Sequence, residues 1–248
     1  MGDVEVANSI SVTGGQYGLQ ATNVSVHGLI RNSGTLAGTI AGLGIVDNSS
    51  VHSDSTIVNN AGGVIQGDAH GILVKSFSTL SGSIYNTGTI RGAVSGIQLE
   101  ANASVLDGRG LVNWAGGVIA GGNVGISVSG HSTLSGDIGI NNQGTISATG
   151  PGISIASNGV VIGGIYNIGS ISSADGQGIV ISSGGTLYGR ITSDGSAAIM
   201  TGISNAGTIF GGGTPIQLIS GSITTGGIRN SGTIFGSESG INIASNAT

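Results

Sequence analysis

The stretch Ile30-Arg31-Asn32-Ser33-Gly34-Thr35-Leu36 is the first of eight copies of one short phrase. Each copy has an aliphatic residue, a variable residue, Asn, a few small residues including Gly, and a second aliphatic residue. Successive Asn residues are 27, 27, 27, 29, 25, 38 and 25 positions apart. They are Asn32, Asn59, Asn86, Asn113, Asn142, Asn167, Asn205 and Asn230. A period between about 20 and 50 residues is typical of a solenoid, in which each unit buries its apolar face against its neighbours.

The composition excludes a disordered chain. Of 248 residues, 51 are Gly and two are Pro, which alone would suggest low complexity. Disordered chains are rich in charge and poor in β-branched residues, whereas here only 7% of residues are charged and Ile and Val recur throughout. We therefore expect the Gly residues to serve tight turns that recur every few residues.

Apolar residues alternate with polar ones in each copy. In the third copy Ile84 is expected to face inward and Tyr85 outward, and in 96–99 Ile97 and Leu99 face inward around Gln98. A period of two predicts a strand, and no segment is long enough for a helix. The sequence predicts an all-β solenoid of about three short strands per coil and roughly 8–9 coils. A further apolar stretch, such as 78–80, closes each coil, and the choice between three and four strands stays open.

The repeat covers the whole chain, so we expect one continuous solenoid over 1–248, about 40 Å long at roughly 4.8 Å per coil. Two copies, 59–65 and 113–119, contain two extra residues at the same turn. The step of 38 predicts a loop insertion near 191–201. Both ends fall within the repeat, which leads us to expect a fragment of a longer, capped array.

The Asn column is interpreted as structural. An Asn side chain can bond local backbone, tolerates the left-handed conformation, and can stack on the Asn of the next coil as an amide ladder. The alternative is a column that binds sugar or takes part in catalysis. We favour the structural interpretation, because all eight copies carry the residue and an active site needs only one.

No pattern indicates an enzyme, a metal site or a cofactor site. The eleven acids form no column; Asp107 and Asp137 occupy similar places in neighbouring coils, and solvated turns explain them better than a catalytic pair. The four His residues have no short metal-ligand spacing. The six Lys and Arg are scattered singly, which excludes a nucleic-acid footprint. No apolar run reaches the roughly 18 residues of a membrane span.

Three aromatic residues are candidates for surface contact. Phe210 and Phe235 follow the second inward Ile of consecutive coils, so they should stack outward about 5 Å apart. Either they mark a contact patch, or an adjoining domain covers them. Trp114, on one of the two enlarged turns, is expected to be the best single exposed anchor.

The phrases Asn86-Thr87-Gly88-Thr89-Ile90-Arg91-Gly92 and Gly96-Ile97-Gln98-Leu99 resemble the passenger repeats of autotransporter (type V secreted) proteins of Gram-negative bacteria. The resemblance covers roughly residues 18–243. It implies a right-handed, single-stranded parallel β-helix displayed at the bacterial cell surface. It also implies an outer-membrane β-barrel translocator in the full-length protein, which would anchor the rod.

Two functions of different class follow from these expectations. The first is a non-enzymatic adhesin or self-associating rod for aggregation and biofilm formation, with sister rods, host matrix or glycan as partners. Its basis is the long repetitive face of Asn, Ser, Thr and Gly, which suits many weak contacts made in parallel. The second is a passive stalk that presents a distal domain. A carbohydrate-active β-helix enzyme is a distant third.

Overall fold

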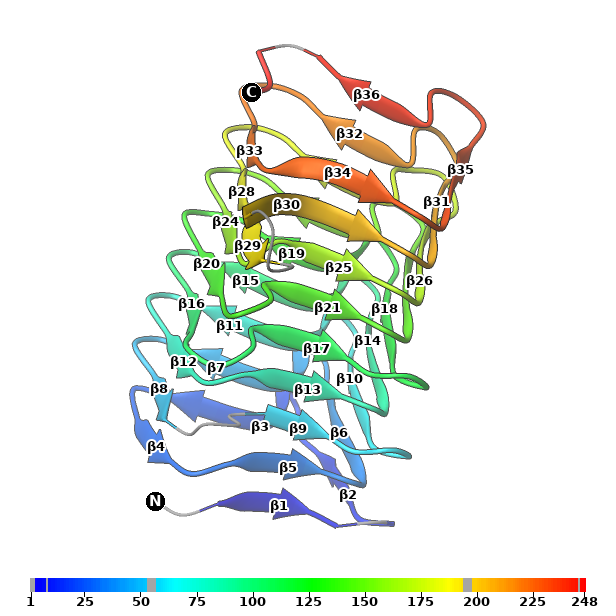
Figure 1. Cartoon of the computed structure of the whole chain (residues 1–248). Helices are drawn as coiled ribbons and strands as arrows, with labels where there is room; N and C mark the ends of the chain where they lie inside the picture. Colours follow the sequence, from blue (N-terminus) through cyan, green and yellow to red (C-terminus); the bar gives the residue numbers. More distant parts are fainter. Residues whose placement is uncertain (1–2, 8, 53–56, 194–197, 245) are drawn as a thin grey trace.

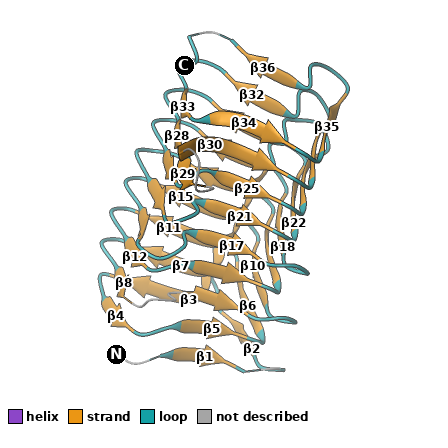
Figure 2. Cartoon of the chain, viewed as in Figure 1, coloured by secondary structure: helices purple, strands orange, loops and turns teal. Residues whose placement is uncertain are grey.

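The chain forms a rod of stacked coils with its two termini at opposite ends (Figure 1). The structure, a computed structural model, describes residues 3–7, 9–52, 57–193, 198–244 and 246–248. These residues form strands and turns only, and no helix is present among them (Figure 2). The coils wind in a right-handed sense from the N-terminal to the C-terminal end (Figure 1). The predicted right-handed parallel β-helix is confirmed.

Each complete coil contributes strands to all four of the sheets that run along the rod. Sheet A carries the Asn column and contains β1 (Val4–Val6), β5 (Ile30–Asn32), β9 (Ile57–Asn59), β13 (Ile84–Asn86), β17 (Leu111–Asn113), β21 (Ile140–Asn142), β25 (Ile165–Asn167), β29 (Arg190–Ser193), β30 (Ala198–Asn205) and β34 (Gly227–Asn230). Sheet B follows and contains β2 (Ser11–Thr13), β6 (Thr35–Gly38), β10 (Val64–Gly67), β14 (Thr89–Gly92), β18 (Val118–Gly121), β22 (Thr145–Ala148), β26 (Ser170–Ser173), β31 (Thr208–Gly211) and β35 (Thr233–Gly236).

The other two sheets complete the coil. Sheet C contains β3 (Tyr17–Thr22), β7 (Ala41–Val46), β11 (His70–Lys75), β15 (Ser95–Glu100), β19 (Val124–Val128), β23 (Ile153–Ile155), β27 (Ile179–Ile181), β32 (Ile216–Leu218) and β36 (Ile241–Ile243). Sheet D contains β4 (Ser25–His27), β8 (Ser50–His52), β12 (Thr79–Ser81), β16 (Ser104–Leu106), β20 (Thr133–Ser135), β24 (Val160–Ile162), β28 (Thr186–Tyr188) and β33 (Ile223–Thr225). Eight coils are thus complete in the described residues and a ninth lacks its sheet D strand.

The choice between three and four strands per coil, which the sequence left open, is resolved in favour of four. The apolar stretch that closes the coil is a separate strand, because two residues in the left-handed conformation precede it in most coils. Ser76 and Phe77, for example, have φ angles of 57° and 61° just before β12. This pair turns the chain sharply between sheets C and D, and neither residue is Gly, so the turn has no simple sequence signal.

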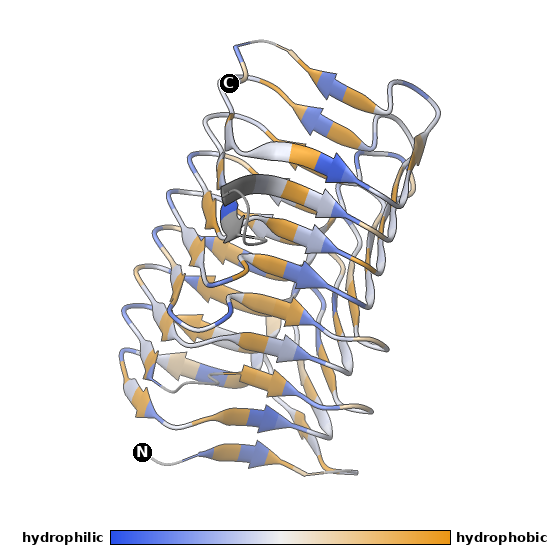
Figure 3. Cartoon of the chain, in the orientation of Figure 1, coloured by the Kyte–Doolittle hydropathy of each residue, from blue (hydrophilic) through white to orange (hydrophobic). Residues whose placement is uncertain are grey.

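A continuous aliphatic column fills the rod. Ile84, Ile90 and Ile97, which the alternation placed inward, are completely buried. Parallel pairing aligns each of them with an aliphatic residue in the coils on either side, as in Ile65–Ile90–Ile119. Hydrophobic positions therefore recur at the same place in successive strands (Figure 3). Since each coil covers the next, the apolar surface is hidden without any helix.

The Asn residues form a buried amide ladder beside this core. Each column Asn is the last residue of its sheet A strand, and its Nδ2 donates to Oδ1 of the Asn in the following coil. All seven of these bonds, from Asn32 to Asn230, measure 2.7–2.8 Å. In the same coil the amide also donates to the backbone of the turn, as from Asn86 to the carbonyl of Gly88 at 3.1 Å. The predicted amide ladder is confirmed.

One part of the Asn interpretation is wrong. None of the eight column residues has a positive φ, so they do not supply left-handed turns. The tight turn from sheet A to sheet B depends instead on the close approach of Gly88 to the backbone of the preceding coil. A Cβ added to Gly88 would collide with the carbonyl oxygens of Gly63 and Asn60. The ladder also starts abruptly. Val6 occupies the aligned position in the first coil, and Oδ1 of Asn32 has no hydrogen-bond partner.

The insertions leave the ladder intact. In the two enlarged copies Gly62 and Gly116 take φ angles of 81° and 85°, and the extra residues form an outward turn. The insertion predicted near 191–201 includes an antiparallel hairpin rather than only a loop: β29 pairs with the first half of β30, with Arg190 opposite Thr201. Residues 194–197 lie outside the described residues. Beyond the hairpin, β30 rejoins the parallel stack, and Asn167 reaches Asn205 at 2.7 Å.

We predict that Asn142→Ala lowers the free energy of unfolding by about 2–4 kcal/mol, because it removes two ladder bonds and leaves buried partners on both sides without theirs. The neighbouring Asn141 is a matched control. It is also buried, but its Oδ1 has no hydrogen-bond partner. Asn141→Ala should therefore cost no more than about 1 kcal/mol. The midpoints of urea unfolding, followed by circular dichroism, give the comparison, and equal midpoints for the two variants would refute the role of the ladder.

Candidate functional site

The outer face of sheet B carries two parallel columns of outward side chains, and the column nearer sheet C is the more varied in residue type. Parallel register aligns the same outward position in all nine strands. The more varied column, called here the B column, consists of Thr13, Ala37, Gln66, Arg91, Ala120, Ser147, Ser172, Phe210 and Phe235. The alignment of Phe210 and Phe235 that the repeat predicted is confirmed.

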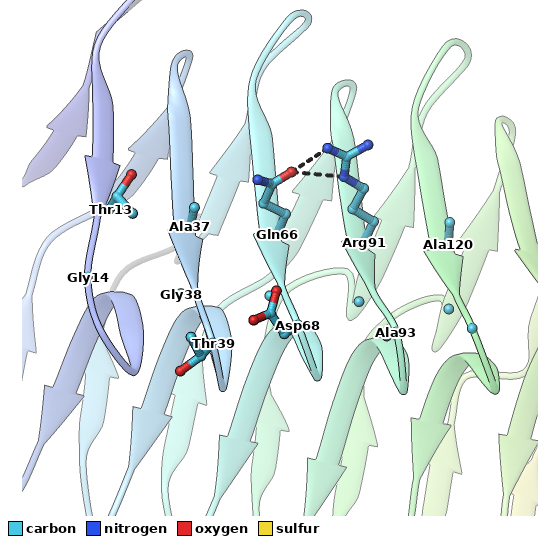
Figure 4. Close-up of a pocket in the computed structure, with 14 residues that line it drawn as sticks. Thr13, Gly14, Ala37, Gly38, Thr39, Gln66, Asp68, Arg91, Ala93 and Ala120 are labelled. Atoms are coloured by element: carbon cyan, nitrogen blue, oxygen red, sulfur yellow. Dashed lines mark hydrogen bonds between the residues drawn. The ribbon is translucent and has the colours of Figure 1, made fainter.

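Half of this face is hollowed into a groove of about 620 Å³ (Figure 4). The groove crosses five coils and is lined by Thr13, Gly14, Ala37, Gly38, Thr39, Gln66, Gly67, Asp68, Arg91, Gly92, Ala93, Ala120, Gly121 and Gly122. Most of these residues are Gly or Ala, so the floor is formed by backbone and methyl groups. The column of Gly residues at the sheet B corner is required for packing. A Cβ at Gly67, for example, would collide with the carbonyl oxygen of His70.

Two polar side chains stand at the middle of the groove. Gln66 on β10 and Arg91 on β14 lie side by side, and Nε of Arg91 donates to Oε1 of Gln66 at 2.9 Å (Figure 4). A second nitrogen of the guanidinium group donates to the same oxygen. The pair holds the guanidinium group along the rod axis and leaves other N–H donors for a partner. The sequence analysis did not single out this site, because Gln66 and Arg91 occupy a variable position of the repeat and are 25 residues apart.

The groove has one carboxylate among its lining residues, that of Asp68. Glycoside hydrolysis ordinarily needs two carboxyl groups on either side of the scissile bond. Asp107 and Asp137, the other pair considered, are both exposed and lie on turns after sheet D strands. They are offset by one position, since the backbone N–H of Asp137 donates to the carbonyl of Gly108 at 3.0 Å. Neither arrangement resembles an acid–base pair.

The other end of the B column is aromatic. The rings of Phe210 and Phe235 stack with centroids 5.8 Å apart and planes inclined by 21°. The side chain of Phe235 is 61% exposed, whereas Phe210 is partly covered. The exposed pair follows the small residues Ala120, Ser147 and Ser172 in the column, so it is a ready hydrophobic contact.

The third aromatic candidate is less accessible than predicted. Trp114 lies on the enlarged A-to-B turn, as expected, but its side chain is partly buried and offers only part of its surface. The sequence analysis overlooked Phe77, which is 65% exposed on a C-to-D turn. It is one of the two left-handed residues of this turn, and no repeat-aligned aromatic residue signals this position.

The members of the Asn column from Asn32 to Asn205 are buried inside the rod and are not accessible to a ligand, whereas Asn230 in the last coil is exposed. In the described parts of the chain, no three His, Asp or Glu side chains gather as metal ligands would. The described residues also include no helix apolar and long enough to cross a membrane.

No protein-family model, curated protein or solved structure matches this chain. The solenoid fold therefore rests on its own repeat and register. The autotransporter resemblance rests on the phrases quoted above.

One titratable group in the rod has a displaced pKa. His70 begins β11, is half-buried, and its Nδ1 lies 2.7 Å from Oγ of Ser95. Burial lowers the pKa of His70 below 6.5; the carboxylate of Glu100 acts in the opposite direction and the ammonium group of Lys75 adds to the lowering. The folded rod therefore binds this proton less readily than the unfolded chain does.

We predict that acidification destabilises the rod through His70. Because the pKa of His70 is lowered in the folded state, its contribution to stability is full at higher pH. That contribution declines as the pH falls below about 6.5 toward the folded-state pKa. His70→Gln, which keeps a hydrogen-bonding side chain, should reduce the fall in melting temperature between about pH 7 and pH 5.5. Melting curves that respond to pH identically in both proteins would contradict this assignment.

Proposed function

We propose that this chain is a non-enzymatic passenger rod of an autotransporter, displayed at the bacterial cell surface, and that it associates with sister rods through sheet B. The observation that carries the proposal is the unequal distribution of side-chain size along the B column. The groove half carries Gln66 and Arg91 among Thr, Gly and Ala residues, and the stacked Phe pair occupies the far end. The passenger-like repeats and the parallel β-helix support the assignment to this class.

Two rods can face each other with opposite directions about a two-fold axis. In the register that brings Phe235 opposite Thr13, the fifth of the nine described sheet B strands faces itself. Phe235 lies opposite Thr13, and Phe210 lies opposite Ala37, both on the groove half of the partner. Arg91 faces Ser147. Every large side chain of the column therefore lies opposite a small one. Because the pair is two-fold symmetric, each of these contacts occurs twice.

The size of the contact predicts weak binding. Nine strands at about 4.8 Å give a face roughly 40 Å long, and a strand of four residues makes it about 13 Å wide. About 500 Å² from each rod is at the low end for a specific interface. Many such contacts made together would still hold two cell surfaces to each other, because each contact raises the effective concentration for the next one. Weak single contacts therefore suit aggregation and biofilm formation.

The rod needs no catalytic group for this role, and the single carboxylate of the groove favours a binding function over the carbohydrate-active alternative. A passive stalk is the competing function. It would require no contact through sheet B, so the experiments below separate the two.

We predict that the double variant Phe210→Ser, Phe235→Ser weakens self-association more than tenfold, because two buried aromatic contacts are lost from each rod. Sedimentation velocity over a range of protein concentrations measures the effect. Phe77→Ser is the matched control, since it removes an equally exposed Phe away from sheet B. A wild-type rod that stays monomeric at high concentration, or equal effects of both variants, would favour the passive stalk.

A charge placed at Ser147 tests the antiparallel register. Ser147→Glu would face Arg91 of the sister rod and should strengthen association several-fold, whereas Ser147→Arg should weaken it by a similar factor. Both effects should shrink in high salt. Ser154→Glu, which adds the same charge on the outside of sheet C, should change little. The same response to Glu and Arg at position 147 would exclude this register.

A further inference from the structure

A second hollow lies on another face of the rod, beside the hairpin. Its volume is about 410 Å³, within the range of roughly 300–1,000 Å³ of small-molecule sites. The polar lining comes from Tyr166, Arg190, Thr201, Ser204, Arg229 and Ser231. These residues belong to β25, the hairpin β29–β30, β34 and the turn after β34.

The hollow arises from an alternation of side-chain size on sheet A. Tyr166, Ser204 and Arg229 are aligned on three adjacent parallel strands, so about 4.8 Å separates each from the next. The small Ser204 therefore lies between an aromatic wall and a guanidinium wall about 10 Å apart. Tyr166 is 39% exposed, which leaves ring surface for a ligand.

The hairpin supplies another wall. Arg190 on β29 pairs with Thr201 on β30, at the point where the inserted chain leaves the regular coil. Across the hollow, Gly163 and Gly164 have φ angles of 106° and 79° and form the turn before β25. A Cβ at Gly164 would lie 2.9 Å from the carbonyl oxygen of Thr201, so this turn must stay free of side chains for the hairpin to lie there.

The charge of the hollow is opposite to that of the chain. The protein has a net charge of −5 and only six Lys and Arg, yet two of these six, Arg190 and Arg229, line this one site. None of its lining residues is acidic. Among the described residues, no side chain forms a hydrogen bond or ion pair with either guanidinium group.

We propose that this hollow binds one residue of a saccharide that carries an oxyanion, either a carboxylate or a sulfate ester. Guanidinium groups suit a planar or tetrahedral oxyanion, because they present several N–H donors in a fixed geometry. The Tyr166 ring can stack on the apolar face of a sugar, and the hydroxyl groups of Thr201, Ser204 and Ser231 can bond its hydroxyls. This site is separate from sheet B and does not depend on self-association.

Isothermal titration of the full chain with four probes tests the proposal: a galacturonic acid trisaccharide, a sulfated galactose trisaccharide, neutral galactotriose and inorganic sulfate. At least one acidic trisaccharide should bind, and the tighter of the two identifies the oxyanion. Galactotriose and inorganic sulfate should each bind at least tenfold more weakly, since galactotriose has no oxyanion and inorganic sulfate has no sugar ring.

Variants assign the binding to the hollow. Arg190→Gln and Arg229→Gln should each weaken binding of the acidic trisaccharide about tenfold, and Ser204→Phe, which fills the space without changing charge, should abolish it. Arg31→Gln is the matched control, because Arg31 occupies the same outward column of sheet A at the far end of the rod and should bind as wild type. Ser147→Arg should also leave this binding unchanged, whatever it does to self-association.

Four results would overturn the proposal. These are no binding of either acidic trisaccharide, equal affinity for the neutral trisaccharide, equal affinity for inorganic sulfate, and wild-type affinity in both Arg variants that fold normally by circular dichroism.

Discussion

The buried amide ladder is the interaction on which the regularity of the rod depends. An amide enclosed among Ile and Leu side chains is costly unless its hydrogen bonds are made, and inside this rod the partners are the backbone of its own turn and the Asn of the adjacent coils. A coil displaced by one position would remove its Asn from the ladder and turn its aliphatic residues toward water. The aliphatic core supplies most of the driving force, and the ladder selects one register.

This constraint explains where the chain tolerates variation. The spacing between ladder residues ranges from 25 to 38 positions, yet the amide-to-amide distance stays at 2.7–2.8 Å. Extra residues are accommodated as an outward turn at Gly62 and Gly116, and as a hairpin before Asn205. Both candidate binding surfaces lie where the repeat varies. The B column varies in side-chain size on a fixed backbone, and the sheet A hollow is bounded by the inserted hairpin.

Much of this architecture could be predicted from the sequence, because a repeat converts linear spacing into spatial alignment. The inward positions of Ile84, Ile90 and Ile97 and the stacking of Phe210 on Phe235 follow from the period alone. The fourth strand could not be assigned in the same way, since the turn before it uses non-Gly residues such as Ser76 and Phe77 in the left-handed conformation. The groove and the hollow were missed for another reason. They depend on which side chains occupy variable positions of the repeat, such as Gln66 and Arg91, and on the inserted hairpin, which brings Arg190 to the same hollow as Arg229.

The ladder also gives the rod a net dipole along its axis. In every rung the N–H points toward the C-terminal end, and the acceptor oxygen faces the N-terminal end, where Oδ1 of Asn32 is left without a donor. The side-chain dipoles consequently add instead of cancelling, as peptide dipoles do in an α-helix. The ladder therefore has a weak net dipole, with its negative end near the first coil and its positive end near the last. Two rods lying side by side attract through these dipoles when they point in opposite directions.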